Sequence, residues 1–528
     1  MKCLVARRES HIFNTLNIMD KIKCVFLLIV VFGLLFSCKQ TLVPETQQTE
    51  PLNNTYYVSI DGLWRVTPET SIKYPHGTLE PILQFHTDAQ GKLTVQGCFL
   101  WDKLFYDYWP FRSIQFNDST RQLVIGYNEV GMYKGIVDYQ TGIIQGTACG
   151  GDPSDTNKLD FIREEDLDVN KLFVPFPPGP NGSIRYAYQQ PEDCMDQLQT
   201  ASLFDFVKDS ASFYTLIDQI ITQEFGRLES LLILKDQKLI LEEYFYGYDR
   251  TQLHNIHSCT KSVTSLLLGI ALDRHQMMNV DQPIFDFFPV FDSLKTPGKE
   301  KITLKHLLTM TAGFSDDDDF EIHDPDDQVK QILSLPMEST PGEEFTYNNN
   351  CTNLLGGIIY TLESKQADEF AKEVLFNKLG ISEFLWEREN GVVHCYSDLH
   401  MYPRDMAKIG LLVLQNGSWN GEQIVPKEWI AESTKPYVAE SEFFDYGYQW
   451  WYRSKGNRSW WENPERGSNN EHDMFLALGY GGQYIMVIRD LNMVIVTTSS
   501  DYNEDNGMAH QKVPMVIEEV VPLFDKEN

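Results

Sequence analysis

The stretch IHSCTKSVTSLLLGIALD, residues 256–273, joins two chemically useful side chains to the start of an apolar segment with helical spacing. Ser258 and Lys261 are three positions apart, so one helical turn places the hydroxyl and the amine on the same face. Ser258 is expected at the helix start, where unpaired backbone N–H groups favour developing negative charge. A serine needs a base before it becomes a nucleophile, and a desolvated lysine can be that base. The alternative is a capping serine followed by a surface lysine, because S-x-x-K is short enough to arise by chance.

A second stretch offers partners for this pair. PGEEFTYNN, residues 341–349, predicts an extended approach and a turn before a helix, with Tyr347 and Asn349 two positions apart on that turn. If Lys261 stabilises Tyr347 as a phenolate, this group can take the serine proton and pass it to a leaving group. Asn349 is expected to hold Lys261 and a substrate carbonyl. The two stretches together predict one cleft that holds a hydroxyl, an amine and a phenol.

A third stretch, LGYGGQ at residues 478–483, enters a predicted strand. Its small residues allow a substrate to lie against the strand edge. The backbone N–H of Gln483 is expected to complete an oxyanion hole with the N–H of Ser258.

In this order, S-x-x-K, Y-x-N and a glycine-ended triad resemble the motifs of the class C β-lactamase and D-alanyl-D-alanine-peptidase family of serine hydrolases. That family includes esterases and 6-aminohexanoate-dimer hydrolases. The resemblance covers about residues 185–525. Three more segments are similar to those of the family: ITLKHLLTMTAGF (302–314), PRDMAKIGLLVLQNGSWNGEQIVP (403–426) and YGYQWW (446–451). The resemblance implies an α/β (α+β) sandwich, in which an antiparallel sheet flanked by helices lies beside an all-helical subdomain.

Carried over by position, the resemblance implies that Ser258 is the acylated nucleophile and Lys261 its activating partner. Tyr347 would be general base and acid, and Asn349 would contact the substrate and the lysine. The first proton acceptor is disputed among related serine enzymes, so this step is assigned to Lys261 and Tyr347 jointly.

Tyr480-Gly481-Gly482 would take the place of the family's K-T-G or H-x-G triad, which binds substrate. True β-lactamases usually place a lysine at the position of Tyr480, to hold the carboxylate of the substrate. A neutral tyrosine cannot supply that charge. This departure favours an esterase or amidase with a less acidic substrate.

Residues 1–38 predict an export signal: Lys21 and Lys23 precede a short apolar run at 25–36. The sequence that ends at Cys38, Leu-Phe-Ser-Cys, resembles a bacterial lipobox, in which the cysteine is lipidated and becomes the first mature residue. The alternative is a plain secretory signal with an incidental cysteine. Translation from Met19 would give a signal of ordinary length. The expected location is the bacterial cell envelope, lipid-anchored in the periplasm or at the outer membrane.

The formal net charge of −31 argues against nucleic acid as a partner, because phosphates would be repelled. The cysteines show no C-x-x-C pairing, so no zinc site is indicated. The acidic run at 316–319 lacks the EF-hand spacing and is interpreted as a solvated loop in preference to a calcium site. No metal or cofactor is therefore expected.

The chain divides into five predicted parts. Residues 39–55 are a polar tether, and residues 56–165 contain short alternating runs typical of a small all-β domain, either barrel or sandwich. Residues 166–200 are a Pro/Gly-rich connector. Residues 201–528 would be the hydrolase domain. Its expected elements are a helix at 204–225, a hairpin with its turn at 235–238, strands at 474–478, 484–488 and 494–498, and a helix at 513–524. Arg404 and Asp405 are expected to form an ion pair.

These observations predict an exported serine hydrolase that cleaves an ester or amide bond in a small-molecule or peptide substrate through an acyl-Ser258 intermediate. An esterase, amidase or peptidase is favoured over a true β-lactamase. The alternative is a lipoprotein that binds or senses a cell-wall or carbohydrate ligand through a degenerate hydrolase cleft. The intact set of Ser258, Lys261, Tyr347 and Asn349 favours the enzyme.

Overall fold

The computed structural model divides the chain into two compact units, Met1–Phe173 and Val174–Asn528, which are described separately. Cys38 and the tether at 39–55 lie outside the described residues. Within the described part of the chain, no helix combines the length and apolarity needed to cross a bilayer. The described residues are 59–74, 77–101, 105–109, 111, 113–126, 132–149, 156–164, 175–176, 186–277, 279–317, 322–441, 443–456, 471–500 and 513–525.

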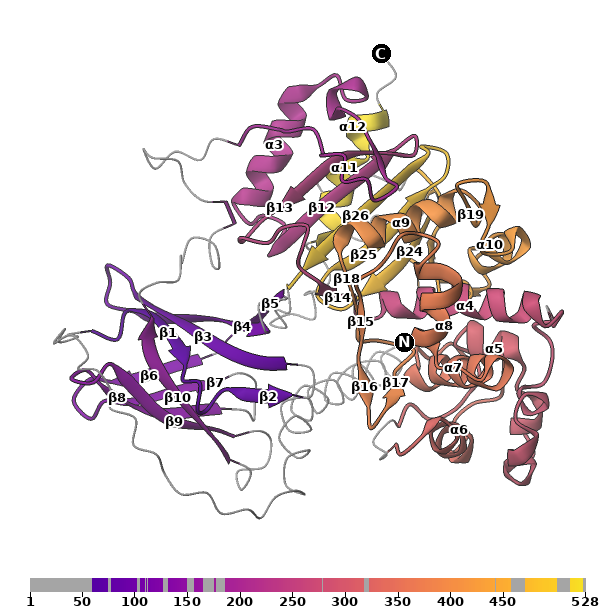
Figure 1. The fold of residues 1–528 in the computed structure, drawn as a ribbon, viewed down its shortest axis with the longest axis horizontal. Helices are drawn as coiled ribbons and strands as arrows, with labels where there is room; N and C mark the ends of the chain where they lie inside the picture. The colour runs from indigo at the N-terminus through magenta and orange to yellow at the C-terminus, as the bar shows by residue number, and fades with distance from the viewer. Residues whose placement is uncertain are drawn as a thin grey trace, which may run out of the picture. The chain divides into compact units, whose positions relative to one another are not determined.

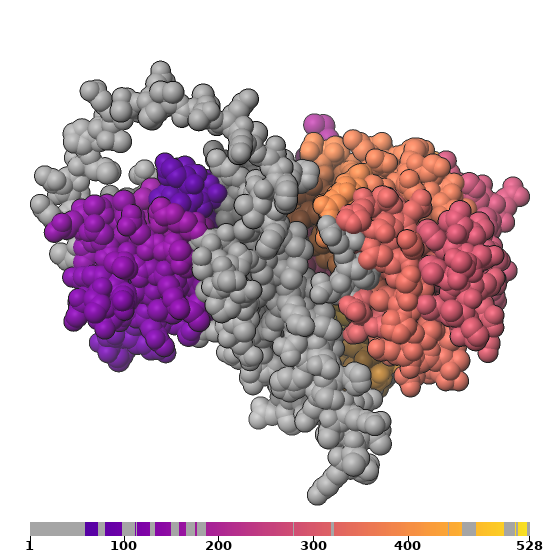
Figure 2. All heavy atoms as spheres, turned by 90° about the horizontal axis from the view of Figure 1, so that it is seen from below, coloured from indigo at the N-terminus to yellow at the C-terminus, as the bar shows by residue number. Residues whose placement is uncertain are grey.

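The first unit is an antiparallel β-barrel that is nearly closed (Figure 1). Eight strands neighbour one another in the order β4-β3-β1-β10-β9-β8-β7-β6, and β4 and β6 at the two ends of this series also approach each other. In the space-filling view, the described residues of this unit pack closely against one another (Figure 2, indigo to purple). The strands are β1 (Gly62–Val66), β2 (Ile72–Tyr74), β3 (Gly77–Thr87), β4 (Leu93–Trp101), β5 (Phe105–Trp109), β6 (Ser113–Asn117), β7 (Gln122–Gly126), β8 (Met132–Asp138), β9 (Ile143–Cys149) and β10 (Thr156–Glu164).

Alternation along these strands builds the interior of the barrel, because successive side chains point to opposite faces. In β8 the buried positions Tyr133 and Val137 alternate with exposed ones. Trp64 is fully buried, and its indole N–H donates to the carbonyl of Ile60 at 2.9 Å. Arg163 lies over the Trp64 ring, 5.3 Å from its centre, and donates to the same carbonyl at 3.3 Å. The all-β prediction is confirmed, and the architecture is the barrel.

The second unit contains a nine-stranded sheet in the order β11-β13-β12-β26-β25-β24-β23-β22-β21. Strands from the start and the end of the unit meet at its centre, where Leu234 of β12 pairs with Val494 of β26. The strands are β11 (Gln199–Thr200), β12 (Leu228–Lys235), β13 (Lys238–Tyr244), β21 (Val438–Ala439), β22 (Asp445–Tyr446), β23 (Trp451–Arg453), β24 (Met474–Gly479), β25 (Gln483–Ile488) and β26 (Met493–Ser499). The expected strands and hairpin are confirmed. The turn residues Asp236 and Gln237 have positive φ angles of 49° and 66°, as a two-residue hairpin turn requires.

Helices cover both faces of this sheet (Figure 1). Helices α9 (Pro403–Leu414) and α4 (Cys259–Arg274) pack on one face, and α11 (Val513–Val520) and α3 (Ser210–Ile221) lie on the other. Residues of β25 and β26 are therefore buried throughout, because neither face meets water. This layering confirms the predicted α/β sandwich.

The predicted helices at 204–225 and 513–524 are each interrupted. The first begins only at Ser210, where the Asp209 carboxylate accepts the Ser212 N–H, and the preceding turn is the separate 3₁₀ helix η1 (Leu203–Asp205). The second divides at Pro522, which begins α12 (Pro522–Asp525). Capping groups and prolines set these boundaries.

In the sequence, the helical subdomain lies between the two groups of strands that form the sheet. Its central helix, α4, is buried on nearly all sides, from Cys259 to Leu272, because it packs against α7, β24 and β25 at once. The other helices of the second unit are η2 (Ile284–Asp286), η3 (Pro289–Leu294), η4 (Lys299–Lys301), α5 (Leu304–Leu308), α6 (Pro325–Ser334), α7 (Asn349–Glu363), α8 (Ala367–Ala371), η5 (Lys372–Phe376) and α10 (Lys427–Ser433). Small sheets are formed by β14 (His254–Asn255), β15 (Leu385–Trp386), β16 (Arg388–Glu389), β17 (Val392–Val393), β18 (Leu399–Met401), β19 (Ser418–Trp419) and β20 (Glu422–Gln423).

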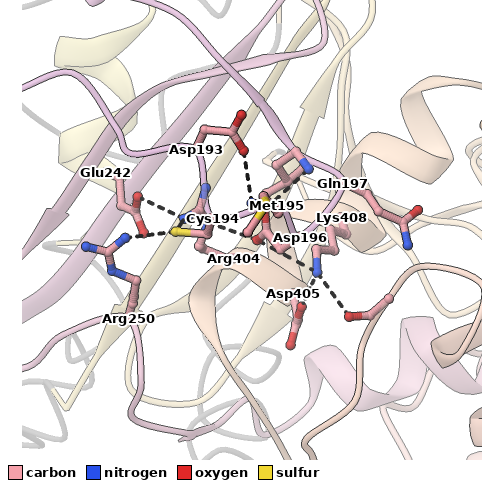
Figure 3. Close-up of polar contacts among 12 residues, drawn as sticks. Asp193, Cys194, Met195, Asp196, Gln197, Glu242, Arg250, Arg404, Asp405 and Lys408 are labelled. Carbon is pink, nitrogen blue, oxygen red and sulfur yellow. Dashed lines mark hydrogen bonds and ion pairs between the residues drawn. The ribbon is translucent and has the colours of Figure 1, made fainter.

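The described end of the connector packs on the second unit through buried charges (Figure 3). Arg404 lies 3.1 Å from Asp196 of the connector and 3.6 Å from Glu242 of β13. Asp405 pairs with Lys408 at 2.8 Å, and burial raises the pKa of Asp405 to about 6 against the opposing charge of Lys408. The expected Arg404–Asp405 pair is wrong, because adjacent helical residues point away from each other.

Candidate active site

Ser258 lies at the N-cap position of α4, as the sequence predicts. The approach to it is held by β14, which pairs with β18, and the N–H of Ile256 donates to Leu399 O at 2.8 Å. His257, directly before the serine, has a positive φ of 45°. A non-glycine residue in this region is strained, and such strain is characteristic of active-site turns.

The structure brings the Lys261 amine to the Ser258 hydroxyl. Lys261 Nζ donates to Ser258 Oγ at 3.0 Å and to the carbonyl of Tyr396 at 3.1 Å. The side chain is 1% exposed. Burial lowers the pKa of Lys261 to about 7, although the charges of Asp398 and Cys259 act in the opposite direction. A substantial fraction of this lysine is therefore neutral near pH 7 and can accept a proton.

Tyr347 meets the same serine from the turn that precedes α7. Its hydroxyl hydrogen-bonds with Ser258, and the Lys261 Nζ lies 4.8 Å from the centre of its ring. Burial raises the pKa of the Tyr347 phenol, and the hydrogen bond with Ser258 only partly offsets this effect. The phenol therefore keeps its proton at neutral pH, in contrast to the phenolate considered from the sequence. Burial thus favours the neutral, proton-accepting form of Lys261 and the protonated form of Tyr347.

Asn349 is the first residue of α7. The side-chain amide of Asn349 makes no hydrogen bond with another described residue, so the expected contact with Lys261 is not formed. Its neighbour Asn348 has a structural role: it donates to the carbonyls of Phe314 and Ser315 at 3.2 and 3.0 Å and caps α7. Asn349 remains at the start of the helix, two residues from Tyr347.

The turn between β24 and β25 lies next to the nucleophile. A β-carbon on Gly479 would clash with the carbonyl of Ile256, two residues before Ser258. The thiol of Cys259 donates to the carbonyl of Gln483 at 3.2 Å. The side chain of Cys259, the residue after Ser258, thus touches the backbone of Gln483.

The side chains of this turn have separate roles. The side-chain amide of Gln483 donates a hydrogen bond to the Ser499 carbonyl and accepts one from the Ser499 N–H at 3.3 Å, so the backbone of Ser499 holds this side chain. The Tyr480 ring meets the edge of the His257 ring with centroids 5.9 Å apart. Gly481 and Gly482 have φ angles of 80° and 101°, which glycine adopts without strain.

Two parts of the site were missed by the sequence reasoning. Trp451 of β23 is half-buried and stacks on Tyr347, with ring centroids 5.6 Å apart. The segment 394–398 provides the carbonyl of Tyr396 and the carboxylate of Asp398 beside Lys261. Neither has a sequence signal, because both act through tertiary packing. In the described ranges no cluster of His, Cys, Asp and Glu has the arrangement of a metal site.

The family model described as Beta-lactamase matches residues 224–513, which is more than half of the chain. The chain belongs to the β-lactamase family. The resemblance inferred from the motifs is confirmed, and the protein is a β-lactamase-family serine hydrolase.

Relatives within or near this family are distant in sequence. The uncharacterized protein BpOF4_21049 of Alkalihalophilus pseudofirmus is 24% identical over 312 residues, which cover 53% of this chain and 85% of that protein. A 6-aminohexanoate-dimer hydrolase of Paenarthrobacter ureafaciens is 21% identical over 310 residues, covering 53% of this chain and 75% of that protein.

Among solved structures, a putative beta-lactamase from Bacteroides dorei DSM 17855 aligns with a TM-score of 0.51 and 17% identity, covering 60% of this chain and 99% of that chain. At this identity the likeness shows the fold alone. It supports the β-lactamase-like α/β architecture of the second unit.

Proposed function

We propose that this β-lactamase-family protein is an exported, lipid-anchored hydrolase that cleaves an ester or amide through an acyl-Ser258 intermediate. The observation that carries the proposal is the contact of 3.0 Å between the Ser258 hydroxyl and a buried lysine with a pKa of about 7. A general base is most effective when its pKa lies near the working pH.

Acylation starts when Ser258 Oγ attacks the substrate carbonyl carbon and its proton moves to Lys261. The carbonyl electrons move to the oxygen, which the N–H groups of Ser258 and Gln483 stabilise. Collapse of this tetrahedral intermediate breaks the bond to the alcohol or amine, which takes a proton from the Tyr347 phenol. Lys261 then returns its extra proton to Tyr347.

Deacylation uses the same groups with water as the nucleophile. Water gives its proton to Lys261 and attacks the acyl carbon. The bond to Ser258 Oγ breaks, the serine oxygen takes the proton of the Tyr347 phenol, Lys261 passes its extra proton to Tyr347, and an acid is released. Asn349 lies two residues from Tyr347 and is proposed to hold a carbonyl group of the substrate in this cleft. No step requires a metal or cofactor.

The substrate is proposed to lack a carboxylate beside the scissile bond. Tyr480 stands where β-lactamases usually place a lysine, and its neighbour across the ring contact is His257. A phenol can donate a hydrogen bond but supplies no positive charge. An ester, amide or small peptide is therefore favoured over a β-lactam acid.

Export and anchoring rest on the N-terminal sequence, with Cys38 as the lipidated residue. Membrane fractionation of the full chain tests this part. Wild-type protein is expected in the membrane fraction and Cys38→Ala in the soluble fraction. Equal partition of both would refute the anchor and leave the hydrolase proposal intact.

The activity is tested with a fluorophosphonate probe and p-nitrophenyl esters. Wild-type protein should label covalently at Ser258 and turn over esters, and Ser258→Ala should lose both properties. Neither label nor turnover in wild-type protein would refute the proposal and favour a binding protein with a degenerate cleft. Nitrocefin and D-Ala-D-Ala peptides, tested in parallel, distinguish the substrate classes.

A further inference from the structure

The loop between β17 and β18 passes directly beside Lys261. The Tyr396 carbonyl accepts a hydrogen bond from Lys261 Nζ at 3.1 Å, and the same nitrogen lies 5.2 Å from the centre of the Tyr396 ring. Lys261 therefore has two acceptors, this carbonyl and Ser258 Oγ. The position of its amine depends on the position of the loop.

Two residues along, the loop carries a buried carboxylate. Asp398 is 8% exposed and has a positive φ of 64°. Its Oδ1 accepts hydrogen bonds from Ser397 Oγ at 3.0 Å and from Asn255 Nδ2 at 3.2 Å. The negative charge of Asp398 favours the protonated form of Lys261, against the larger effect of burial. Burying a carboxylate in a strained backbone conformation is costly, so a functional reason is expected.

Asn255 connects Asp398 to the backbone before the nucleophile. While its amide nitrogen donates to Asp398, its Oδ1 accepts the N–H of His257 at 2.8 Å. His257 is the residue with the left-handed backbone conformation that precedes Ser258. One carboxylate is thus linked to the lysine by charge and to the serine turn by two hydrogen bonds.

His394 faces Asp398 from the other end of the loop. Its Nδ1 lies 4.0 Å from Asp398 Oδ2, and its Nε2 lies 3.0 Å from Glu389 of β16. Its ring stacks on Tyr396, whose hydroxyl is 3.3 Å from Nδ1. Burial lowers the pKa of His394, but Glu389, Asp398 and the more distant Glu387 outweigh burial and raise it. The surrounding carboxylates therefore favour the protonated form of this imidazole.

We propose that Asp398 is a positioning residue of this active site, holding Lys261 and the His257–Ser258 turn in their reactive arrangement, and that His394 moderates its charge. The inference rests on the proposed function, in which Lys261 accepts the serine proton. Lys261 also faces Tyr347, Cys259 and Tyr396. His394 also faces Glu389, Glu387 and Tyr396.

The two residues have opposite charges, so their removal has opposite effects on the pH profile. Without the carboxylate, in Asp398→Asn, protonated Lys261 is less stable, and the rise of kcat/KM on the acid side moves to lower pH. Without the imidazolium, in His394→Gln, the charge of Asp398 acts on Lys261 undiminished, and this rise moves to higher pH. Each displacement is expected to be on the order of half a pH unit or more.

The experiment is a kcat/KM profile between about pH 5 and about pH 9 for p-nitrophenyl butyrate, with thermal melting of each variant as a check on folding. His472→Gln is the matched control, because His472 is also a histidine of low exposure paired with a carboxylate, Asp490 at 2.6 Å, elsewhere in the unit. Its profile should coincide with that of the wild type. If Asp398→Asn does not fold, His394→Gln tests the direction by itself.

Three outcomes would overturn the inference. Variants with lower kcat but an unmoved acid-side rise would show that the loop has only a structural role. Displacement of both profiles in the same direction would contradict the charge argument. If wild-type protein shows no turnover that depends on Ser258, both the proposed function and this inference are overturned. This outcome differs from the first two, in which the wild-type protein is active.

Discussion

Trp451 stacks on Tyr347, with ring centroids 5.6 Å apart and the two planes inclined by 28°. Trp451 belongs to β23, in the sheet, and Tyr347 belongs to the turn before α7, in the helical subdomain. The phenol that meets Ser258 is therefore positioned by an aromatic contact between the two layers of the hydrolase unit.

Replacing Trp451 is expected to lower kcat more than it raises KM. An aromatic pair contributes about 0.5–1.5 kcal/mol beyond its buried area, so Trp451→Leu should reduce kcat by up to about tenfold. Trp451→Phe keeps a ring on Tyr347 and should retain most of the activity. Steady-state kinetics with a p-nitrophenyl ester provides the comparison. A Leu variant with wild-type kcat would show that the stacking does not position the phenol.

The activity should depend on the deprotonation of Lys261 near neutral pH. Lys261 must be neutral to accept the Ser258 proton, and burial lowers its pKa to about 7. The value of kcat/KM is therefore expected to rise with pH and to reach half its maximum near that pKa. A profile that keeps rising to the ordinary lysine range would mean that the lysine is not the base.

We expect the buried Lys261 to lower the free energy of unfolding, although the same residue supports activity. Its pKa is lowered from 10.5 in the unfolded chain to about 7 in the folded one, so the unfolded chain binds more protons between these values. The free energy of unfolding therefore rises with pH between the two pKa values of Lys261, and the full destabilisation by this lysine is present below about pH 7. Each tenfold loss of proton affinity on folding corresponds to about 1.4 kcal/mol of that cost.

Lys261→Met removes this cost, so it should raise the free energy of unfolding most below about pH 7 and progressively less toward higher pH. Urea denaturation at about pH 6 and about pH 9 measures the difference. Ser258→Ala, which leaves the lysine in place, is the control and should show no such pH-dependent gain. Equal effects of Lys261→Met at both pH values would contradict the lowered pKa of the lysine.

Gly479→Ala should impair catalysis through the backbone. A β-carbon there would meet the carbonyl of Ile256, so β24 and the turn that leads to Ser258 must separate. Gly410→Ala is a matched control, because its β-carbon would meet the side chains of Val494 and Ile485 on the sheet. Both variants should melt at lower temperature, but only Gly479→Ala should lower kcat/KM of the folded protein. Equal kinetic losses would refute a specific role for Gly479.

Tyr480→Lys tests the substrate class. An ammonium at this position supplies the charge that a carboxylate-bearing substrate needs. The variant should gain kcat/KM toward such substrates relative to neutral esters. The ratio of the two kcat/KM values, measured on a neutral p-nitrophenyl ester and on its carboxylated analogue, is the quantity to compare with wild type. An unchanged ratio would contradict the proposed role of Tyr480.

Short-range patterns predicted the features that depend on one segment. The spacing of Ser258 and Lys261 sets their contact on α4, and the apolar runs around residues 236–237 set the hairpin. Helix boundaries were less accurate where a local cap decides, as at Asp209. The protonated state of Tyr347 could not be predicted, because it depends on burial by distant segments.

The surroundings of Lys261 were the least predictable part of the site. Tyr396 and Asp398 lie in a loop without periodic hydrophobicity, and their importance arises only when β18 pairs with β14 beside the serine turn. Trp451 has the pattern of a strand residue, which does not distinguish the core from the cleft. Contacts of this kind are properties of the tertiary structure and not of local composition.

The pairing of β12 with β26 joins segments about 260 residues apart, as in the match of Leu234 with Val494. Because non-local contacts require closure of a long loop before they contribute stability, the centre of this sheet is expected to form late in folding. A growing polypeptide would leave the ribosome with the nucleophile, the lysine and the phenol already synthesised but without the strands that assemble them. A hydrolase of this topology is thus inactive during its own synthesis until its final strands have emerged.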